Sequence, residues 1–126
     1  MVLDVVESYK KFFTPVASLG DGVYASVMPG GKVDVRVWVS KSDGWKPVGS
    51  KTYKQGATMD VATFHKLVDG TLTEDAAVVA EALSDGRVRL AEKFPGGESV
   101  GVRLSGAQWE ALVADKDAIA AATPAL

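Results

Sequence analysis

Aromatic and basic side chains alternate with valine and alanine in two neighbouring segments of the first half of the sequence. From Lys32 to Ser40, four valines are interleaved with Lys, Asp, Arg, Trp and Ser, and in Val23–Met28 the residues Tyr24 and Ser26 alternate with apolar ones. An aromatic ring can stack on an unpaired base, while lysine and arginine can neutralise phosphates. Because stacking requires unpaired bases, this combination of residue types is typical of a surface that binds single-stranded nucleic acid.

The same alternation extends the candidate surface to later segments of the chain. The stretch 45–54 carries three lysines and a tyrosine, and the corresponding outward positions of the second half are again basic. The candidate nucleic-acid-binding residues are Tyr24, Ser26, Lys32, Arg36, Trp38, Lys46, Lys51, Tyr53, Lys54, Arg87, Arg89, Lys93 and Arg103. The structural alternative is that an N-terminal helix or a second subunit covers Trp38 and Tyr24.

Few residues suit other kinds of chemistry. The sequence has no cysteine and a single histidine, His65, which excludes disulfides, cysteine nucleophiles and multi-histidine metal sites. The segment 20–25 fits the pattern G-x-G-x-x-A but leads into a predicted strand, and the Gly-Gly-Lys at 30–32 lacks the spacing of a phosphate loop. Asp115 and Asp117 fit a solvated helix face better than a metal pair. We therefore predict that the chain is not an enzyme and that it uses no metal and no cofactor.

Charge is divided unevenly along the chain, although the formal net charge is only −2. Residues 10–66 contain nine Lys or Arg and four Asp or Glu, a net charge of +5, whereas residues 67–126 contain five basic and ten acidic residues, a net charge of −5. Such asymmetry can mark a surface for an anionic partner, and an ordinary solvated surface is the alternative interpretation.

A repeat of pattern organises the sequence. An offset of 55 aligns a predicted hairpin in each half and matches Val35 with Leu90, and an offset of 45 aligns a predicted helix in each half and matches Phe64 with Trp109. The difference of ten residues falls within Lys41–Gly56, where the first half is longer. We expect internal repeats at about 14–69 and 70–126.

The first repeat is predicted to consist of strands followed by a helix. Period-2 alternation and turn residues place strands near Val16–Leu19, at Val23–Met28 and Lys32–Lys41, and more weakly at Trp45–Lys54. The helix is expected to start with Asp60 as its N-cap and to end at Gly70.

The second repeat follows the same order. Strands are predicted at Ala77–Leu83, Arg87–Phe94 and Glu98–Leu104. Ser105 and Gln108 have the spacing of a capping box, and the helix that they begin is expected to reach Thr123. Apolar residues at helical spacing also suggest a helix over residues 3–13, ahead of both repeats.

The length of 126 residues, with 47% apolar and 24% charged residues, fits one globular domain, 1–126. The expected fold is α+β, with two antiparallel-sheet-plus-helix repeats in a ββββαββββα-like order that form an intrachain pseudo-dimer. No apolar run approaches the roughly 20 residues of a membrane span and no signal peptide is evident, so we expect a soluble, cytoplasmic protein without a membrane partner.

Two segments resemble one superfamily of single-stranded-DNA-binding proteins. The strand–turn–strand of residues 24–38, followed by Gly-Trp-Lys-Pro at 44–47, resembles the DNA-binding domain of the eukaryotic positive-cofactor-4 transcriptional coactivators. Gly101–Trp109, which reads GVRLSGAQW, resembles the family's Gly-Ile-Ser-Leu-x-x-x-Gln-Trp junction between a strand and a helix. Two repeats in one chain are similar to the plan of the Whirly proteins and the mitochondrial guide-RNA-binding proteins.

This resemblance implies a fold and a site. It implies two splayed sheets with helices packed between them, and nucleic acid lying across the sheet surfaces. The family's basic and aromatic binding residues match Arg36, Trp38 and Lys46 best. The second half is acidic, and Glu92 falls at an inward-pointing position, so the first half is expected to carry most of the binding.

The predicted function is therefore non-enzymatic binding of single-stranded DNA or RNA through basic and aromatic sheet faces, in replication, recombination or transcription. The composition, rich in Ala, Val and Gly, would suit a GC-rich bacterium or its phage. The rival interpretation is a protein-interaction or homo-oligomerisation module in which Trp38 and Tyr24 anchor a partner chain.

Overall fold

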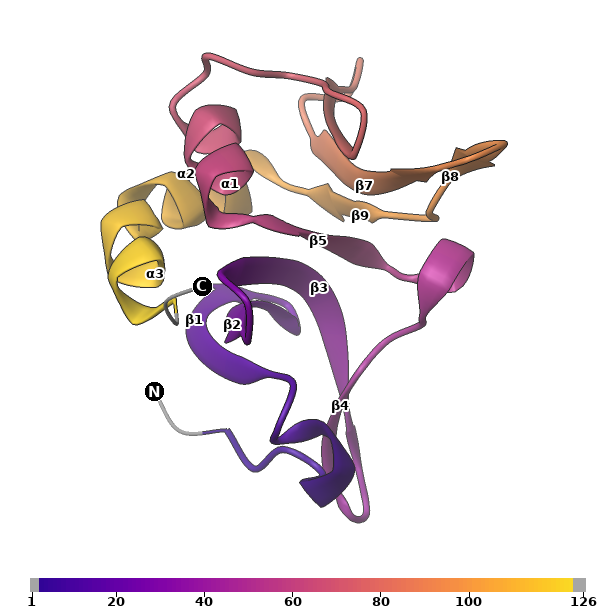
Figure 1. Cartoon of the computed structure of the whole chain (residues 1–126), viewed down its shortest axis with the longest axis vertical. Helices are drawn as coiled ribbons and strands as arrows, with labels where there is room; N and C mark the ends of the chain where they lie inside the picture. Colours follow the sequence, from indigo (N-terminus) through magenta and orange to yellow (C-terminus); the bar gives the residue numbers. More distant parts are fainter. Residues whose placement is uncertain (1–2, 124–126) are drawn as a thin grey trace.

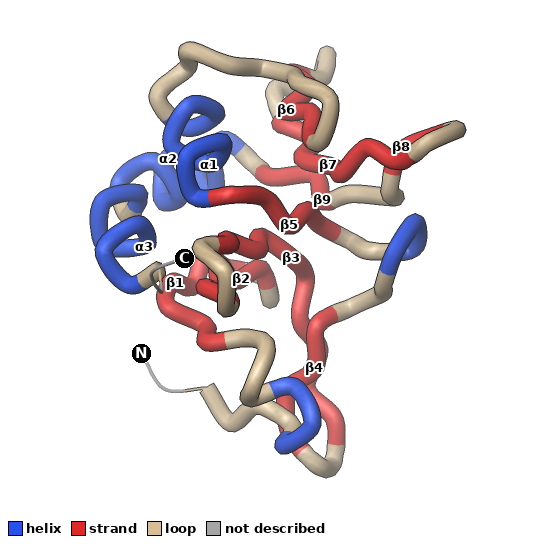
Figure 2. Tube along the Cα trace, viewed as in Figure 1, coloured by secondary structure: helices blue, strands red, loops and turns tan. Residues whose placement is uncertain are grey.

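Residues 3–123 are described by a computed structural model, in which two antiparallel sheets lie beside a group of three helices (Figure 1). The fold is α+β, as the sequence predicts, and its elements follow the order of two repeats. Figure 2 shows these three helices gathered on one side of the molecule, while two short helical turns lie apart from them near the strands.

The first sheet is organised around one long strand, β3. Its members are β1 (Thr14–Gly20), β2 (Val23–Met28), β3 (Lys32–Lys41), β4 (Gly44–Pro47) and β5 (Gly56–Asp60). On one edge β3 pairs with β2, while on the other its first half pairs with β5 and its last residues pair with β4. The length of β3 follows from its alternating β-branched residues, which favour a continuous extended backbone.

The second sheet repeats this plan on a smaller scale. It contains β6 (Val78–Ala82), β7 (Val88–Phe94), β8 (Gly97–Glu98) and β9 (Val102–Leu104). The strand β7 pairs with β6 on one edge and with β9 and then β8 on the other.

The pairing registers confirm the repeat and both of its offsets. In the first sheet Val35 lies opposite Ala25 and Ala57, and in the second sheet its counterpart Leu90 lies opposite Ala80 and Val102. These partners are the residues that the offsets of 55 and 45 predict.

Equivalent glycines occupy the same close contact in both repeats. A Cβ on Gly56 would lie 2.0 Å from the carbonyl oxygen of Val35, and a Cβ on Gly101 would lie 2.7 Å from that of Leu90. Both distances are shorter than a Cβ atom can tolerate. Each repeat therefore has glycine where the segment that leads into the helix approaches the long central strand, β3 or β7.

Three helices follow the strands: α1 (Val61–Val68), α2 (Gly106–Ala114) and α3 (Lys116–Ala122). The predicted capping box is confirmed, because Ser105 Oγ accepts from the Gln108 N–H and Gln108 Oε1 accepts from the Ser105 N–H. Asp60 precedes α1 as predicted, but its side chain makes no capping bond and instead pairs with Lys32.

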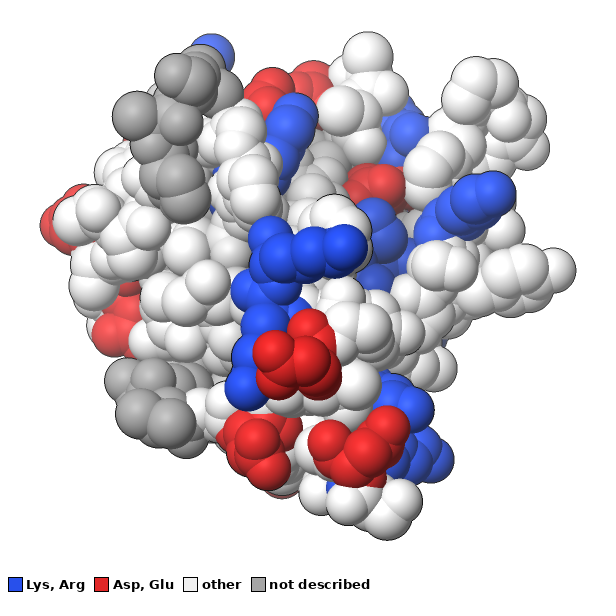
Figure 3. Space-filling view, turned by 60° about the horizontal axis from the view of Figure 1, so that its bottom comes forward, with Lys and Arg blue, Asp and Glu red and all other residues white. Residues whose placement is uncertain are grey.

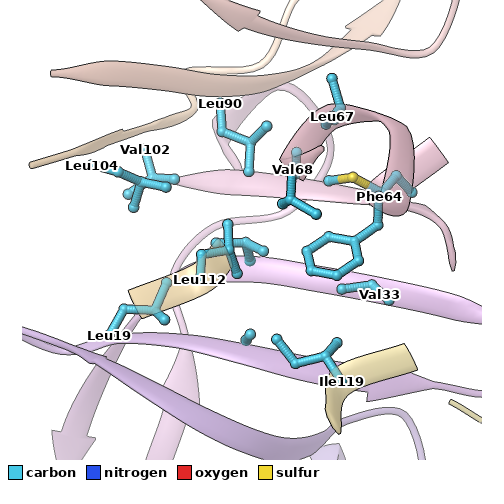
Figure 4. Packing of buried hydrophobic residues seen from close by; sticks show 14 of the residues in the cluster. Leu19, Val33, Phe64, Leu67, Val68, Leu90, Val102, Leu104, Leu112 and Ile119 are labelled. Atoms are coloured by element: carbon cyan, nitrogen blue, oxygen red, sulfur yellow. The ribbon is translucent and has the colours of Figure 1, made fainter. Parts of the chain in front are cut away.

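Both sheets and all three helices contribute to one hydrophobic core. Figure 4 shows Leu19 and Val33 from the first sheet and Leu90, Val102 and Leu104 from the second pointing toward the helices. The helical side chains that meet them are Phe64, Leu67, Val68, Leu112 and Ile119. The shared core is what makes the two repeats an intrachain pseudo-dimer.

The leading segment, residues 3–13, is not the predicted helix. Its only helical part is a 3-10 turn, η1 (Glu7–Tyr9). Val5 forms a parallel bridge with Trp45, and the Val6 N–H donates to the Trp45 carbonyl at 3.0 Å. Pairing with β4 holds this part of the segment extended, which overrides the helical spacing of its apolar residues.

Four further features differ from the sequence prediction. The predicted strand 45–54 ends at Pro47, because the chain then leaves the sheet: it turns at Gly49 (φ 78°) and Lys51 (φ 53°) into η2 (Lys51–Tyr53) and returns at Gln55, whose carbonyl accepts from the Val37 N–H. The strand β5 was not predicted. The predicted strand 98–104 is divided into β8 and β9 by Gly101, whose φ is 77°, and the predicted helix 106–123 is divided at Asp115.

Candidate nucleic-acid interface

The predicted outward residues of the first hairpin do share one face of the sheet. Tyr24 lies opposite Arg36 and Ser26 lies opposite Asp34, and directly opposed residues project from the same side. Trp38 follows at the same parity along β3, and Trp45 joins this face because it lies opposite Ser40. We refer to this side as the outer face of the first sheet.

The expectation that this face is open to solvent is wrong. Trp38 is 2% exposed, Arg36 is 4% exposed and Ser26 is fully buried. Phe13 of the leading segment meets the Trp38 ring edge-on, with 5.6 Å between centroids, and its own ring lies 5.3 Å from the Arg36 guanidinium. Period-2 alternation identifies the side on which a residue lies, but it carries no information on whether a distant segment covers that side.

Arg36 is held inside the protein by two acceptors, a carboxylate and a backbone carbonyl. Its guanidinium donates to Asp34 Oδ1 at 2.8 Å and to the Gly49 carbonyl at 2.7 Å, and Thr58 Oγ1 donates to the same Asp34 oxygen at 2.7 Å. Asp34 is fully buried, so this ion pair holds the Arg36 guanidinium in position inside the fold. Arg36 therefore serves as a buried ion-pair partner.

Beside this covered face lies a groove of about 580 Å³ that several of the candidate residues share. We call it the basic groove, and its lining includes Tyr9, Phe13, Met28, Lys32, Arg36, Pro47, Gly49, Ser50, Lys51, Lys54, Thr58 and Glu92. Figure 3 shows lysine and arginine atoms on both sides of a hollow in this face, with acidic atoms among them.

The three lysines of the basic groove differ in how firmly they are paired. Lys32 Nζ lies 2.5 Å from Asp60 in an exposed ion pair, whereas Lys54 Nζ lies 2.7 Å from Glu92 in a pair that is mostly buried. Lys51 is exposed and makes no ion pair with any residue between 3 and 123. An exposed pair contributes little, so Lys32 and Lys51 are the cations most available to an anion.

Glu92 joins the two halves of the chain at this groove. One of its oxygens, Oε1, accepts both from Lys54 Nζ and from the backbone N–H of Thr58 on β5, the latter at 2.5 Å. Glu92 belongs to β7, so the second repeat supplies the acidic residue of a groove whose cations belong to the first. The sequence analysis noted the inward position of Glu92, which is unusual for a glutamate, but it did not predict the contacts with Lys54 and Thr58.

Three further candidates of the first repeat lie outside the basic groove lining. Tyr53 in η2 is 77% exposed, Tyr24 is half-buried, and Lys46 is paired with Asp43 at 3.6 Å. Tyr24 contacts the rings of Trp38 and Trp45, whereas Tyr53 is two residues from Lys51 in η2 and is mostly exposed to solvent.

The basic residues of the second sheet are separate from the basic groove. Arg89 and Arg103 lie directly opposite each other, and Arg89 is paired with Glu98 at 2.8 Å. Lys93 pairs with Glu74. Arg103 lines a second groove of about 580 Å³ together with Arg87.

Arg87 already forms an ion pair with an acidic residue, Asp85. Its side chain donates to Asp85, which raises the pKa of Arg87 above its ordinary value, and the same hydrogen bond lowers the pKa of Asp85. The structure thus does not bring the predicted residues of the two sheets into one surface.

The sequence analysis missed several groove residues. Tyr9 and Phe13 were assigned to a helix, Ser50 lies in the predicted strand 45–54 but was not a candidate, and Thr58 lies in a part of the chain with no predicted element. Within residues 3–123, no group of three or more His, Cys, Asp or Glu side chains is arranged to hold a metal ion. None of the helices described for this stretch has the length and apolar character needed to cross a membrane.

Comparison of the chain with family models, with curated proteins and with solved structures gives no match.

Proposed function

We propose that this protein binds single-stranded nucleic acid, without catalysis, in the basic groove. The observation that carries the proposal is the convergence of three lysines and two aromatic rings from separate segments on one hollow surface. The proposal keeps the chemistry expected from the sequence and its resemblance to the positive-cofactor-4 and Whirly superfamily. The proposed site is the basic groove at the edge of the first sheet, whereas the sequence analysis expected binding across the sheet face.

The lysines provide sites for successive phosphates. Lys51 is exposed and has no acidic partner among the described residues, and the exposed pair of Lys32 with Asp60 can be exchanged for a phosphate at small cost. Two phosphate contacts on a single strand, at Lys32 and Lys51, correspond to a slope of about −1.4 in the logarithm of affinity against the logarithm of salt concentration. Affinity should therefore fall about sevenfold between 50 and 200 mM salt.

Aromatic rings near these lysines provide stacking partners for bases. Tyr53 is 77% exposed and is two residues from Lys51 in η2, while Tyr9 and Phe13 line the groove itself. Stacking of a base on such a ring contributes about 1–3 kcal/mol and discriminates little among bases. We therefore expect binding with weak sequence preference, suited to the protection or presentation of unpaired strands in replication, recombination or transcription.

The test is a titration of labelled oligo-dT at 50 and 200 mM salt with matched charge-reversal variants. Lys51→Glu should weaken binding and reduce the salt slope by about 0.7. Lys66→Glu makes the same charge change on α1, does not line the basic groove, and should have a much smaller effect. Equal effects of the two variants would refute the groove as the site. Parallel titrations with oligo-U and with duplex DNA distinguish DNA from RNA and single from double strands.

A protein-interaction or homo-oligomerisation module is the second candidate function. The observation that favours it is an exposed apolar pair: Tyr53 is 77% and Val100 is 51% exposed, and the Val100 N–H donates to the carbonyl of Thr52, next to Tyr53. An apolar interface would respond little to salt and would appear as a concentration-dependent increase in mass by sedimentation. The two candidates therefore differ in salt dependence: nucleic-acid binding weakens as salt is added, whereas association through an apolar interface changes little.

A further inference from the structure

We propose that the buried ion pair of Arg36 and Asp34 positions the loop that presents Lys51 and Tyr53, so that Arg36 is a positioning residue of the basic groove. We call residues 48–55 the binding loop. The inference rests on the proposed function, because it concerns how the groove presents its exposed cation and ring. It assigns a role to two side chains that are nearly closed to a ligand, since Arg36 is 4% exposed and Asp34 is fully buried.

The binding loop is closed at its base. The Gln55 N–H donates to the Val48 carbonyl at 3.2 Å, which joins the two ends of the loop. Both ends are also bonded to β3, because the Val48 N–H donates to the Val37 carbonyl at 2.9 Å and the Gln55 carbonyl accepts from the Val37 N–H at 3.1 Å. Compact loops whose ends meet in this way can hold a fixed shape on a protein surface. The base of the loop is therefore fixed to the sheet, and its tip depends on other contacts.

The tip of the binding loop has a strained backbone. Lys51 has a φ of 53°, in the left-handed region that residues with a side chain rarely adopt. Gly49 has a φ of 78°, and a Cβ there would lie 2.0 Å from the Tyr53 carbonyl oxygen, so the chain is wound tightly between these residues. Backbone conformations of this kind persist only when surrounding contacts hold them, and they are frequent at binding sites.

Arg36 supplies such a contact from inside the protein. One guanidinium nitrogen donates to Asp34 Oδ1 at 2.8 Å, and another donates to the Gly49 carbonyl at 2.7 Å. Among the side-chain hydrogen bonds of the described residues, this bond to Gly49 is the one that reaches residues 48–53.

The second repeat holds the other half of the binding loop. The Val100 N–H donates to the Thr52 carbonyl at 2.9 Å, and the Gly101 N–H donates to the Lys54 carbonyl at 3.0 Å. Because these bonds lie after Lys51 in the chain, the bond from Arg36 is the contact that fixes the half of the loop before it.

Stability alone does not account for the buried ion pair. Arg36 Nε and Asp34 Oδ2 have no hydrogen-bond partner among the described residues. A buried ion pair stabilises a fold only when its remaining donors and acceptors are satisfied, and apolar residues of similar volume often serve as well. The planar guanidinium suits a positional role, because the nitrogen that Asp34 fixes determines where the other nitrogen points.

A loop held in this way reduces the cost of binding. Lys51 is exposed and Tyr53 is 77% exposed, so a backbone that is already ordered presents both side chains to solvent. Without the bond to Gly49 the same side chains could still contact a strand, but the loop would have to be ordered at each binding event. We therefore expect weaker binding with the same number of phosphate contacts.

Two variants release the loop, and a third serves as a control. The double variant Asp34→Leu with Arg36→Met removes the bond to Gly49 and leaves no unpaired charge in the interior. Arg36→Lys keeps the charge opposite Asp34 but replaces the fork of nitrogens by a single ammonium group, and it provides the test if the double variant does not fold. Ser105→Ala removes the capping box of α2, outside the basic groove, and controls for a general loss of stability.

The experiment makes two measurements on each folded protein. The first is ¹⁵N relaxation of residues 48–55 without oligonucleotide, and the second is titration of oligo-dT at 50 and 200 mM salt. Both loop variants should show increased motion of the binding loop and about tenfold weaker binding, with a salt slope that stays near −1.4. Ser105→Ala should show neither change.

The salt slope separates positioning from direct contact. A slope reduced by about 0.7 in the double variant would mean that Arg36 itself contacts a phosphate, and would overturn this inference. An ordered loop or an unchanged affinity in both loop variants would also overturn it, while leaving the basic groove standing as the site. Failure of the wild-type protein to bind would refute the proposed function, whereas the relaxation data would still decide whether Arg36 holds the loop.

Discussion

Replacement of Trp38 by alanine measures how deeply the indole is built into the fold. The ring is 2% exposed, and Phe13 and Tyr24 pack edge-on against it. Truncation of a buried tryptophan to alanine destabilises a protein by about 3–5 kcal/mol, through lost apolar contact and the cavity that remains. The Trp38 indole N–H has no partner, so its removal should return about 1 kcal/mol of that loss. We therefore expect Trp38→Ala to lower the free energy of unfolding by about 2–4 kcal/mol.

Urea denaturation followed by circular dichroism measures this change. With a slope near 2 kcal/mol/M for a small domain, the midpoint should move down by about 1–2 M. Trp38→Phe is the matched control, because it keeps an aromatic ring while removing the unpaired N–H, and its unfolding free energy should stay within about 1 kcal/mol of wild type. A fully stable Trp38→Ala protein would show that the ring lies in solvent and that the cover described for it is wrong.

Three further perturbations follow from particular contacts. Glu92→Gln should tighten oligonucleotide binding and steepen its salt dependence, because it removes the acid that pairs with Lys54 in the basic groove; titrations at two salt concentrations measure both effects, and weaker binding would contradict the assigned electrostatics. Ser105→Ala should lower the free energy of unfolding by about 1 kcal/mol through loss of the capping box on α2, measured by urea denaturation. The hydroxyl and N–H of Thr71 lower the pKa of Asp69. The stability that this ionised carboxylate contributes should therefore be fully present above the ordinary aspartate pKa and be lost as pH falls through the lower, folded-state value; a carboxyl titration by NMR with an ordinary midpoint would refute it.

Much of the fold was predictable because local patterns and tertiary structure agree. Period-2 alternation in β2 and β3 identified both strands and the face that each residue occupies, and the same logic applied to β6 and β7. The offsets between repeats correspond to real pairing partners, so a weak similarity of pattern contained the register of both sheets.

The elements that were missed depend on contacts between distant residues. The leading segment has helical apolar spacing, yet its pairing with Trp45 keeps Val5 and Val6 extended. The strand β5 contains Gly56, a residue that is unfavourable in strands, and forms where that glycine allows close approach to Val35. Neither contact leaves a periodic signal in the local sequence.

The candidate site was predicted in its chemistry but not in its location. Lys32, Lys51 and Lys54 do converge, but Trp38 and Arg36 are buried beneath Phe13. The sequence contains the reason in retrospect, since an arginine two residues from an aspartate on the same strand face can form an internal ion pair. Whether such a pair is buried depends on the segment above it, which sequence periodicity does not describe.

An NMR titration of ¹⁵N-labelled protein with oligo-dT tests the central claim most directly, because every backbone amide reports its own environment. The account predicts progressive, salt-sensitive shifts concentrated at residues 49–54 and at Lys32 and Thr58, around the basic groove. Shifts confined to the helices α1–α3, or a spectrum unchanged by a large excess of oligonucleotide at low salt, would contradict it.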